Sequence, residues 1–299
     1  MAFLLKKETQ FKIKKMIKFG ASMLTWISKW TPESGLYAIE QANKTGYDVL
    51  EILLPNDLNL DVKTIKKQFK TNNIQGNYAL ILPPNCHLTI YPKQALRLLK
   101  DAIDIVESFE GNLLTGVLYS AIAQFSGTLR TNTEWRCMKE VIWEAAIYAH
   151  KKGIELALEP INRYETYLLT SAQEVLNLIA EIDLPNLGLH LDTFHMNIEE
   201  RSFYEPIVAA GKHLKHIHIC ENDRGIVGKG NIRWNNFFEG LSEINYSGSL
   251  VLESFSSEVK ELIVPTSLWR ASDYSSNQLA KESLLFMKKK AVEFGLCIA

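Results

Sequence analysis

The chain has 299 residues, of which 46% are hydrophobic, and its 33 basic and 34 acidic residues give a formal charge of −1. This length allows one large barrel or two ordinary domains, and the hydrophobic content is sufficient for a large core. The balanced charge gives no electrostatic argument for binding nucleic acid or an anionic membrane surface. No apolar run approaches the length of a membrane span. We therefore expect a soluble, cytoplasmic protein with neither nucleic acid nor membrane as a partner.

The cysteines and the first residues agree with that expectation. The four cysteines contain no CxxC pair, which is typical of reduced thiols and not of a disulfide framework or a zinc knuckle; they are Cys86, Cys137, Cys220 and Cys297. The first sixteen residues are rich in lysine but lack the apolar stretch of a signal peptide. We expect residues 1–16 to be a flexible extension. Residues 17–299 are expected to form one catalytic domain, because no linker-like stretch divides them.

From residue 17 onward, short apolar runs alternate with longer amphipathic stretches. The predicted strands are residues 17–24, 49–54, 74–82, 113–119, 154–159, 187–192, 214–220 and 250–255. The predicted helices are residues 32–45, 61–71, 92–109, 134–152, 172–182, 199–210, 234–244 and 278–294. Near-continuous apolar runs are typical of strands that are covered on both faces. Eight strands and eight helices in strict alternation predict a closed (β/α)8 TIM barrel and disfavour a doubly wound open sheet.

Cap and loop signals support these boundaries. Ser171 can cap the helix that follows it, and Glu174, three residues later, would complete a capping box. Gly46 lies at a predicted helix end, where a left-handed residue is useful. The segment 256–273, after the last strand, is longer than a usual connection in this architecture, so we expect it to be a functional loop.

Potential metal ligands close four successive strands: Glu159, Asp192, His218 and Glu253. Catalytic groups of a parallel barrel gather at the carboxyl ends of its strands, so these four side chains are expected to converge on one cation. Three carboxylates and an imidazole suit Mn²⁺, Co²⁺ or Mg²⁺ better than a metal that prefers thiolates. Each residue alone would more often be a helix cap or an ion-pair partner. The interpretation therefore depends on the coincidence of all four.

Other polar residues on these strands need separate interpretation. His216 and His218 share a strand face by the two-residue period, so either could be the ligand, and His218 is favoured because it is nearer the strand end. His190 precedes Asp192 by two residues and is expected one layer deeper. We expect His190 and His216 to be structural or to orient the ligands by hydrogen bonds. Cys220 falls in the turn and is left out of the site.

Several strings around these positions are specific. They are Glu-Pro-Ile-Asn-Arg-Tyr-Glu at 159–165, Leu-Asp-Thr-Phe-His-Met-Asn-Ile-Glu-Glu at 191–200, the stretch 214–234, and Leu-Glu-Ser-Phe at 252–255. Together they resemble the D-tagatose/D-psicose (allulose) 3-epimerase family, which belongs to the xylose-isomerase-like TIM barrels. The similarity is close over the second half of the barrel and loose over the first half.

The resemblance implies a role for individual residues. One divalent metal ion would be bound by Glu159, Asp192, His218 and Glu253. The O1–O2 end of a free ketose would be held by Glu165, His195 and Arg224. Trp30 looks like the tryptophan that covers the substrate in that family, although Trp26 also fits, and Phe255 looks like an apolar wall of the pocket. The resemblance also implies a homo-oligomer, either a dimer or a tetramer.

The chemistry of C3 inversion explains why two glutamates are needed. A proton must be removed from one face of C3 and returned to the other. Glu159 and Glu253 come from strands three apart in an eight-stranded ring, so we expect them to act as bases on opposite sides of the carbon. A metal ion bound to the carbonyl and the adjacent hydroxyl oxygen would stabilise the enediolate between the two steps. The sequence thus predicts a divalent-metal-dependent ketose 3-epimerase.

Some positions depart from the family. Ser254 stands where a proline usually follows the last glutamate, and Ala121 and Ile122 stand near where a bulky aromatic is usual. The loop 83–86 also carries no feature of a sugar site. Positions of the first half shape the pocket around C4–C6, so the sequence predicts the reaction class more firmly than the sugar.

Alternative interpretations stay open at this point. A related aldose–ketose or hydroxypyruvate-type isomerase, or an inosose dehydratase, would use a similar ring of ligands. An abasic-site endonuclease of the related barrel type would need a multinuclear zinc site and a basic groove, which seven histidines and a near-neutral charge disfavour. Within the site, Glu165 could pair only with Arg163, and Arg224 could be a solvated loop residue.

Overall fold

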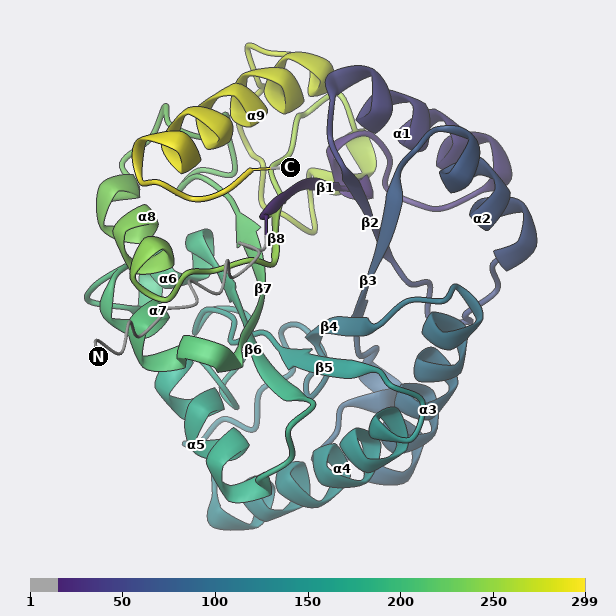
Figure 1. The fold of residues 1–299 in the computed structure, drawn as a ribbon. Helices are drawn as coiled ribbons and strands as arrows, with labels where there is room; N and C mark the ends of the chain where they lie inside the picture. The colour runs from purple at the N-terminus through teal and green to yellow at the C-terminus, as the bar shows by residue number, and fades with distance from the viewer. Residues whose placement is uncertain (1–15, 299) are drawn as a thin grey trace, which may run out of the picture.

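The computed structural model describes residues 16–298, so residues 1–15, which make up nearly all of the expected extension, lie outside the described part. Within the described residues, parallel strands form one closed barrel in which each strand pairs with the next and β8 pairs with β1 (Figure 1). The strands are β1 (Lys18–Ser22), β2 (Val49–Leu53), β3 (Gln75–Ile81), β4 (Leu113–Val117), β5 (Glu155–Leu158), β6 (Leu187–Asp192), β7 (Leu214–Ile219) and β8 (Ser249–Leu252). The predicted (β/α)8 TIM barrel is confirmed, while the exact domain bounds stay a prediction.

Helices form a ring outside the strands (Figure 1). They are α1 (Pro32–Thr45), α2 (Val62–Thr71), α3 (Pro92–Ser108), α4 (Asn132–His150), α5 (Ala172–Ile182), α6 (Thr193–Glu199), α7 (Glu205–Ala210), α8 (Trp234–Glu243) and α9 (Ser276–Glu293). Short 3-10 helices lie in the connections: η1 (Met23–Thr25), η2 (Pro84–Cys86), η3 (Gly211–His213) and η4 (Lys260–Leu262). Among the helices described, none combines the length and the apolar character that crossing a membrane requires.

The predicted helix at 199–210 is wrong in its first half. The chain instead forms α6 directly after β6, and only α7 lies inside the predicted range. Helix α6 begins early because Oδ1 of Asp192 accepts the N–H of Phe194 at 2.8 Å. It ends at Glu199, because the backbone of the next residue, Glu200, is extended. One carboxylate oxygen of Asp192 therefore caps α6, and the other oxygen remains available at the mouth of the barrel.

The predicted cap of α5 is half correct. The Ser171 side chain accepts the N–H of Glu174 at 3.4 Å, as expected. The Glu174 carboxylate, however, accepts the N–H of Thr170 at 2.8 Å, so the reciprocal bond of a capping box is not formed with Ser171. Gly46 ends α1 in the left-handed conformation that the sequence indicated.

A glycine lets β3 and β4 approach closely. Gly116 in β4 has φ +112°, and a Cβ built on it would lie 2.5 Å from the carbonyl oxygen of Leu80 in β3. The Gly116 carbonyl in turn accepts the N–H of Glu159 at 3.0 Å. Any residue with a Cβ would be strained at this backbone conformation. Glycine at position 116 therefore allows β4 to bind the N–H of Glu159, directly after β5.

The register determines which side chains face the barrel interior on β2 to β4. Thr115 contacts His190 inside the barrel, and it pairs with Ala79 of β3, which pairs in turn with Leu53 of β2. Side chains two residues apart on a strand share a face. Leu53, Ile81 and Val117 therefore face the interior at the carboxyl ends of their strands, and they make this side of the mouth apolar.

The two ends of the long segment after β8, residues 256–273, are hydrogen-bonded to each other. Ser257 and Ser272 each donate a backbone N–H to the other's hydroxyl, at 3.1 and 2.9 Å. The Glu258 carboxylate accepts the N–H of Ser276 at the start of α9, at 2.8 Å. These bonds connect the two ends of the segment to each other and to α9. A functional role for residues 256–273 stays a prediction.

Candidate active site

Four side chains lie together where the last four strands end. Glu159 and Glu253 directly follow β5 and β8, Asp192 ends β6, and His218 lies in β7. One ligand-capable atom from each of them lies within 4.8 Å of the others. His218 Nδ1 is 3.7 Å from Glu159 Oε1 and 3.4 Å from Glu253 Oε2. The structure thus brings together the four residues that the sequence singled out, and we call them the ligand cluster.

The donors of the ligand cluster fit a divalent cation. His218 Nδ1 is fully buried and has no hydrogen-bond partner among the described residues, although carboxylates surround it. Buried polar atoms normally have a partner, so this nitrogen indicates a group that is still to be bound. Carboxylate oxygens with one imidazole nitrogen are a donor set that Mn²⁺, Co²⁺ and Mg²⁺ accept. The cluster could therefore hold such an ion.

The crowding of carboxylates changes their proton affinities. Burial raises the pKa of Glu159 and of Asp192, and the negative charge of Glu253 adds to both shifts. Burial alone would also raise the pKa of Glu253, but the positive charges of His218 and Arg224 bring it below its usual value. A cation bound among these carboxylates would favour their charged forms and so lower the pKa of Glu159 and of Asp192 again.

Arg224 is part of this space. Its Nη1 lies 3.0 Å from Asp192 Oδ2 and 3.0 Å from Glu253 Oε2, and its side chain is 11% exposed. The guanidinium carbon lies 3.9 Å from the ring centroid of Phe194 and 5.2 Å from that of Phe255. The alternative interpretation of Arg224 as a solvated loop residue is therefore wrong. Its guanidinium is held by two carboxylates and two aromatic rings.

His195 presents an N–H to the ligand cluster. The backbone N–H of Asn162 donates to His195 Nδ1 at 3.2 Å, and the Asn162 side-chain amide lies 2.9 Å from the same nitrogen. Because Nδ1 accepts, the proton of a neutral ring must be on Nε2. That atom lies 3.6 Å from Asp192 Oδ2 and 4.0 Å from Glu159 Oε1. Burial and the charge of Arg224 hold the pKa of His195 well below its usual value, so the ring is neutral.

Glu165 is held by the same asparagine. Its Oε1 accepts from Asn162 Nδ2 at 2.7 Å, so Asn162 connects it to His195. The alternative in which Glu165 pairs with Arg163 is wrong. Arg163 instead binds Glu199 through two side-chain nitrogens, at 2.9 and 2.8 Å.

Comparison with known proteins agrees with this geometry. Residues 39–290 match the family described as xylose isomerase-like TIM barrel. An L-ribulose 3-epimerase from Methylomonas sp. is 33% identical over 92% of this chain and 98% of its own length. A ketose 3-epimerase from Arthrobacter globiformis is 30% identical over 92% of this chain and 96% of its own length. The chain belongs to the ketose 3-epimerases. The resemblance and the enzyme class expected from the sequence, a carbohydrate epimerase, are confirmed.

Solved structures give the same result. The crystal structure of a D-allulose 3-epimerase from Methylomonas sp. in complex with D-allulose is 33% identical in sequence. It superposes with a TM-score of 0.87 and covers 92% of this chain and 98% of that chain. A D-psicose 3-epimerase from Clostridium cellulolyticum H10, solved with D-tagatose, is 29% identical with a TM-score of 0.82 over 91% of this chain and 99% of that chain. The family relationship therefore extends over nearly the whole barrel.

Two tryptophans of this family member were candidates for covering a substrate. The partly buried Trp30 packs against Gly35 in the first turn of α1, where an added Cβ would collide with its ring. Trp26 is buried, and its Nε1–H donates to Asn277 at 2.9 Å. Trp30 thus packs against α1, and Trp26 is hydrogen-bonded to α9. Covering of a substrate by Trp30 stays a prediction.

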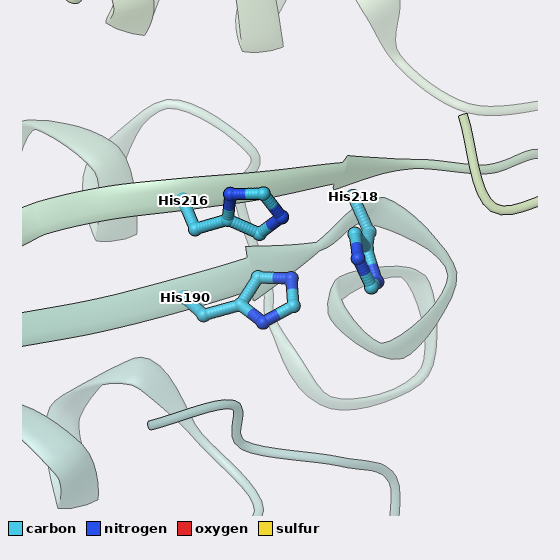
Figure 2. Close-up of side chains that lie close together, drawn as sticks. All are labelled: His190, His216 and His218. Atoms are coloured by element: carbon cyan, nitrogen blue, oxygen red, sulfur yellow. The ribbon is translucent and has the colours of Figure 1, made fainter. Parts of the chain in front are cut away.

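A buried glutamate of β2 was missed by the sequence analysis. Glu51 lies below the ligand cluster, with Oε1 2.7 Å from His218 Nε2 and Oε2 2.7 Å from His216 Nε2. Figure 2 shows His216 and His218 on β7 and His190 beside them on β6. The available signal was an acidic residue within the apolar run Val-Leu-Glu-Ile-Leu, since a charge inside a buried strand requires a partner.

The side of the mouth opposite the ligand cluster contains an apolar cavity. Its volume is about 280 Å³, and it lies at the carboxyl ends of β2 and β3. The lining is Leu53, Leu54, Asn56, Ile81, Leu82, Pro83, Pro84 and Ile122. Ile122, which departs from the usual family pattern, thus contributes to this wall together with the loop 83–86.

A second missed glutamate fixes the loop that carries Arg224. Glu221 is fully buried, and its Oε1 accepts the N–H of Gly228 at 2.8 Å and the indole N–H of Trp234 at 2.7 Å. Its backbone carbonyl accepts the N–H of Arg224 at 3.1 Å. The loop from β7 to α8 is therefore folded around this carboxylate.

Replacing Glu221 with glutamine is expected to destabilise the protein by about 2–3 kcal/mol, because an amide nitrogen would face N–H donors that now bind a charged oxygen. The midpoint of urea unfolding measures this change. Glu293→Gln is the matched control, since Glu293 pairs with Lys290 on the surface of α9 and should change stability by less than about 0.5 kcal/mol. Equal effects of the two variants would contradict the role of Glu221.

Proposed function

We propose that this protein is a divalent-metal-dependent epimerase that inverts C3 of a free ketose through an enediolate. The observation that carries the proposal is the position of Glu159 and Glu253, which face one buried space from β5 and β8. The proposal is supported by the relatives, which are named L-ribulose 3-epimerase, ketose 3-epimerase and D-psicose 3-epimerase.

The ligand cluster would hold the ion, which we propose to be Mn²⁺, Co²⁺ or Mg²⁺. A cation bound there supplies a positive charge beside the two adjacent ketose oxygens, where negative charge develops when C3 loses its proton. Asp192 and His218 take no part in proton transfer in this proposal. They contribute one oxygen and one nitrogen donor between the two glutamates.

Glu159 and Glu253 are the proposed acid–base pair. One carboxylate takes the C3 proton from its side of the sugar, and the other returns a proton from the opposite side. The Nε2–H of His195 and the guanidinium of Arg224 would donate to the O1–O2 end of the ketose. Glu165 would accept from a substrate hydroxyl.

Apolar groups would shape the remainder of the substrate site. We propose that Phe255 forms a wall beside the Arg224 guanidinium and that Trp30 covers the sugar. The apolar cavity near Leu53 and Ile122 would face the far carbons of the ketose, C4 to C6. Assembly as a dimer or tetramer and a cytoplasmic location also stay predictions.

A ketose panel tests the reaction. Purified protein with Mn²⁺ or Co²⁺ is incubated in D₂O with fructose, tagatose, psicose and ribulose, and the products are separated chromatographically. We expect C3 epimers that carry deuterium at C3. An aldose product, with the carbonyl moved from C2 to C1, would instead support the related isomerase. No deuterium at C3 of any ketose would exclude the proposed function.

Removal of divalent ions is expected to abolish turnover, by at least about 100-fold, because the two ketose oxygens then lack a cation beside them. Turnover should return when Mn²⁺ or Co²⁺ is added back. The added ion should also raise the unfolding midpoint of wild-type protein, since it binds only the folded state. Asp192→Asn is the control, and it should lose most of this stabilisation. Full turnover in the presence of a chelator would contradict the metal requirement.

A further inference from the structure

The buried Glu51 contacts two histidines from the other side of the barrel. It lies on β2, is 1% exposed, and its Oε1 forms a hydrogen bond of 2.7 Å with His218 Nε2. Its Oε2 lies 2.7 Å from Nε2 of His216, which is one layer deeper on β7. Glu51 has no role in the proposed reaction. A carboxylate buried this completely nevertheless needs a compensating interaction.

The two nitrogens of His218 have different surroundings. Nδ1 faces Glu159 and Glu253 and forms no hydrogen bond within the described chain. Nε2 faces Glu51, whose carboxylate can only accept. The proton of a ring that binds a cation must therefore be on Nε2. The lone pair of Nδ1 then points into the ligand cluster.

A third histidine restricts the ring of His218. His190 meets it edge-on, with ring centroids 4.1 Å apart and planes at 86° (Figure 2). His190 is itself fixed, because its Nδ1 lies 2.9 Å from the hydroxyl of Thr115, which donates to the carbonyl of Ala157 at 3.2 Å. The His218 ring is thus held both by a hydrogen bond and by its neighbour.

The three histidines could also be considered as a second cation site, because their nitrogens lie within 4.8 Å of one another. The distances disfavour this. Two ligands of one tetrahedral ion, each about 2.0–2.1 Å from it, are about 3.3 Å apart. Glu51 lies only 2.7 Å from the nitrogens of both His216 and His218. The contact with His218 is a hydrogen bond, so Glu51 shares a proton with that ring and does not join it as a ligand of the same ion.

We propose that Glu51 is a positioning residue. It holds the proton of His218 on Nε2 and so presents Nδ1 to the divalent cation, while its other oxygen lies beside His216. This inference rests on the proposed function, because it assumes a cation in the ligand cluster. Partners of this kind typically change metal affinity 10- to 100-fold when they are removed.

Calorimetric titration of metal-free protein with Mn²⁺ tests the proposal. Glu51→Gln keeps the shape but loses the charge and one acceptor, so we expect binding to weaken about 10- to 100-fold. Glu155→Gln is the matched control, because Glu155 is also a strand glutamate but pairs with Lys215 at 2.6 Å, outside the ligand cluster. It should bind within about twofold of wild type. Circular dichroism would establish that both variants are folded.

A measurement on the wild type keeps the proposal testable if Glu51→Gln does not fold. Nitrogen-15 spectra of the imidazoles, recorded with diamagnetic Mg²⁺ or Zn²⁺, should show His218 protonated on Nε2. Protonation on Nδ1 would overturn the proposal, as would equal Mn²⁺ affinity of Glu51→Gln and wild type.

The failures of the two proposals are distinguishable. Wild-type protein that binds no divalent ion would overturn both the proposed function and the role of Glu51. Wild type that binds one ion as tightly as folded Glu51→Gln would overturn only the role of Glu51. Two Mn²⁺ ions in wild type, one of them lost in Glu51→Gln, would assign Glu51 to a second cation site and overturn its positioning role.

Discussion

Glutamine in place of Glu159 or Glu253 is expected to lower ketose epimerisation by about 10³-fold or more, because each variant lacks one group of the proposed acid–base pair. The two carboxylates face the same buried space from β5 and β8, so neither can replace the other on its own side of the sugar. The measurement is the rate of C3 epimer formation at saturating Mn²⁺, which separates proton transfer from weaker metal binding.

Exchange with solvent distinguishes a base from a mere ligand. With one base left, each variant should still exchange the C3 hydrogen of one epimer for deuterium without forming the other epimer, since a single carboxylate can remove and return a proton on one face. Glu159→Gln and Glu253→Gln should differ in which epimer exchanges. Loss of exchange in both epimers for both variants would show that the glutamates act only through metal binding.

Glu199→Gln is the matched control for these variants. Glu199 follows Asp192 by seven residues, but its carboxylate binds Arg163 and not the ligand cluster. We expect its turnover to stay within about threefold of wild type, because a glutamine can still accept the backbone N–H of Arg163 and the ion pair with the exposed Arg163 side chain contributes little. A fall comparable to that of Glu159→Gln would indicate that any loss of a nearby carboxylate is harmful.

Alanine at position 116 is expected to destabilise the protein by about 3 kcal/mol or more. The backbone there has φ +112°, and the added Cβ would lie 2.5 Å from the Leu80 carbonyl oxygen, so β3 and β4 must separate. The midpoint of urea unfolding measures the loss. Because the Gly116 carbonyl holds the N–H of Glu159, folded Gly116→Ala protein should also bind Mn²⁺ more weakly.

Gly127→Ala separates the collision from the backbone conformation. Gly127 also has a positive φ, +79°, but no atom lies within 4 Å of the position that an added methyl group would take. Its replacement should therefore cost only about 1–2 kcal/mol, the penalty of a left-handed alanine. Equal losses for Gly116→Ala and Gly127→Ala would mean that contact with Leu80 is unimportant.

Most of the fold could be predicted because parallel, doubly covered strands are apolar along their whole length and alternate with amphipathic helices. The ligand cluster could be predicted for a related reason. Successive parallel strands end at one edge, so Glu159, Asp192 and Glu253 had to lie near one another once the barrel was assumed. Helix α6 escaped prediction, because its start depends on a cap formed by Asp192, a residue that had been assigned to the mouth.

Contacts across the barrel could not be predicted in this way. Glu51 is 167 residues from His218 in sequence, and their contact exists only because β2 and β7 face each other across the closed barrel. The pairing of Arg224 with two carboxylates likewise depends on a left-handed backbone at that residue, φ +62°, which a non-glycine residue rarely adopts. The local sequence pattern does not show which strands face each other in the closed barrel, and it does not show the backbone conformation of this loop.

The two halves of the chain contribute different parts of the barrel mouth. The ligand cluster comes from β5 to β8, whereas the apolar wall of Leu53, Ile81 and Val117 comes from β2 to β4. A chimera that takes its first four strands from a relative would thus acquire a new apolar wall opposite the retained ligand cluster. Glu51 is the contact that such a graft must preserve, because it reaches from the exchangeable half to a histidine of the retained one.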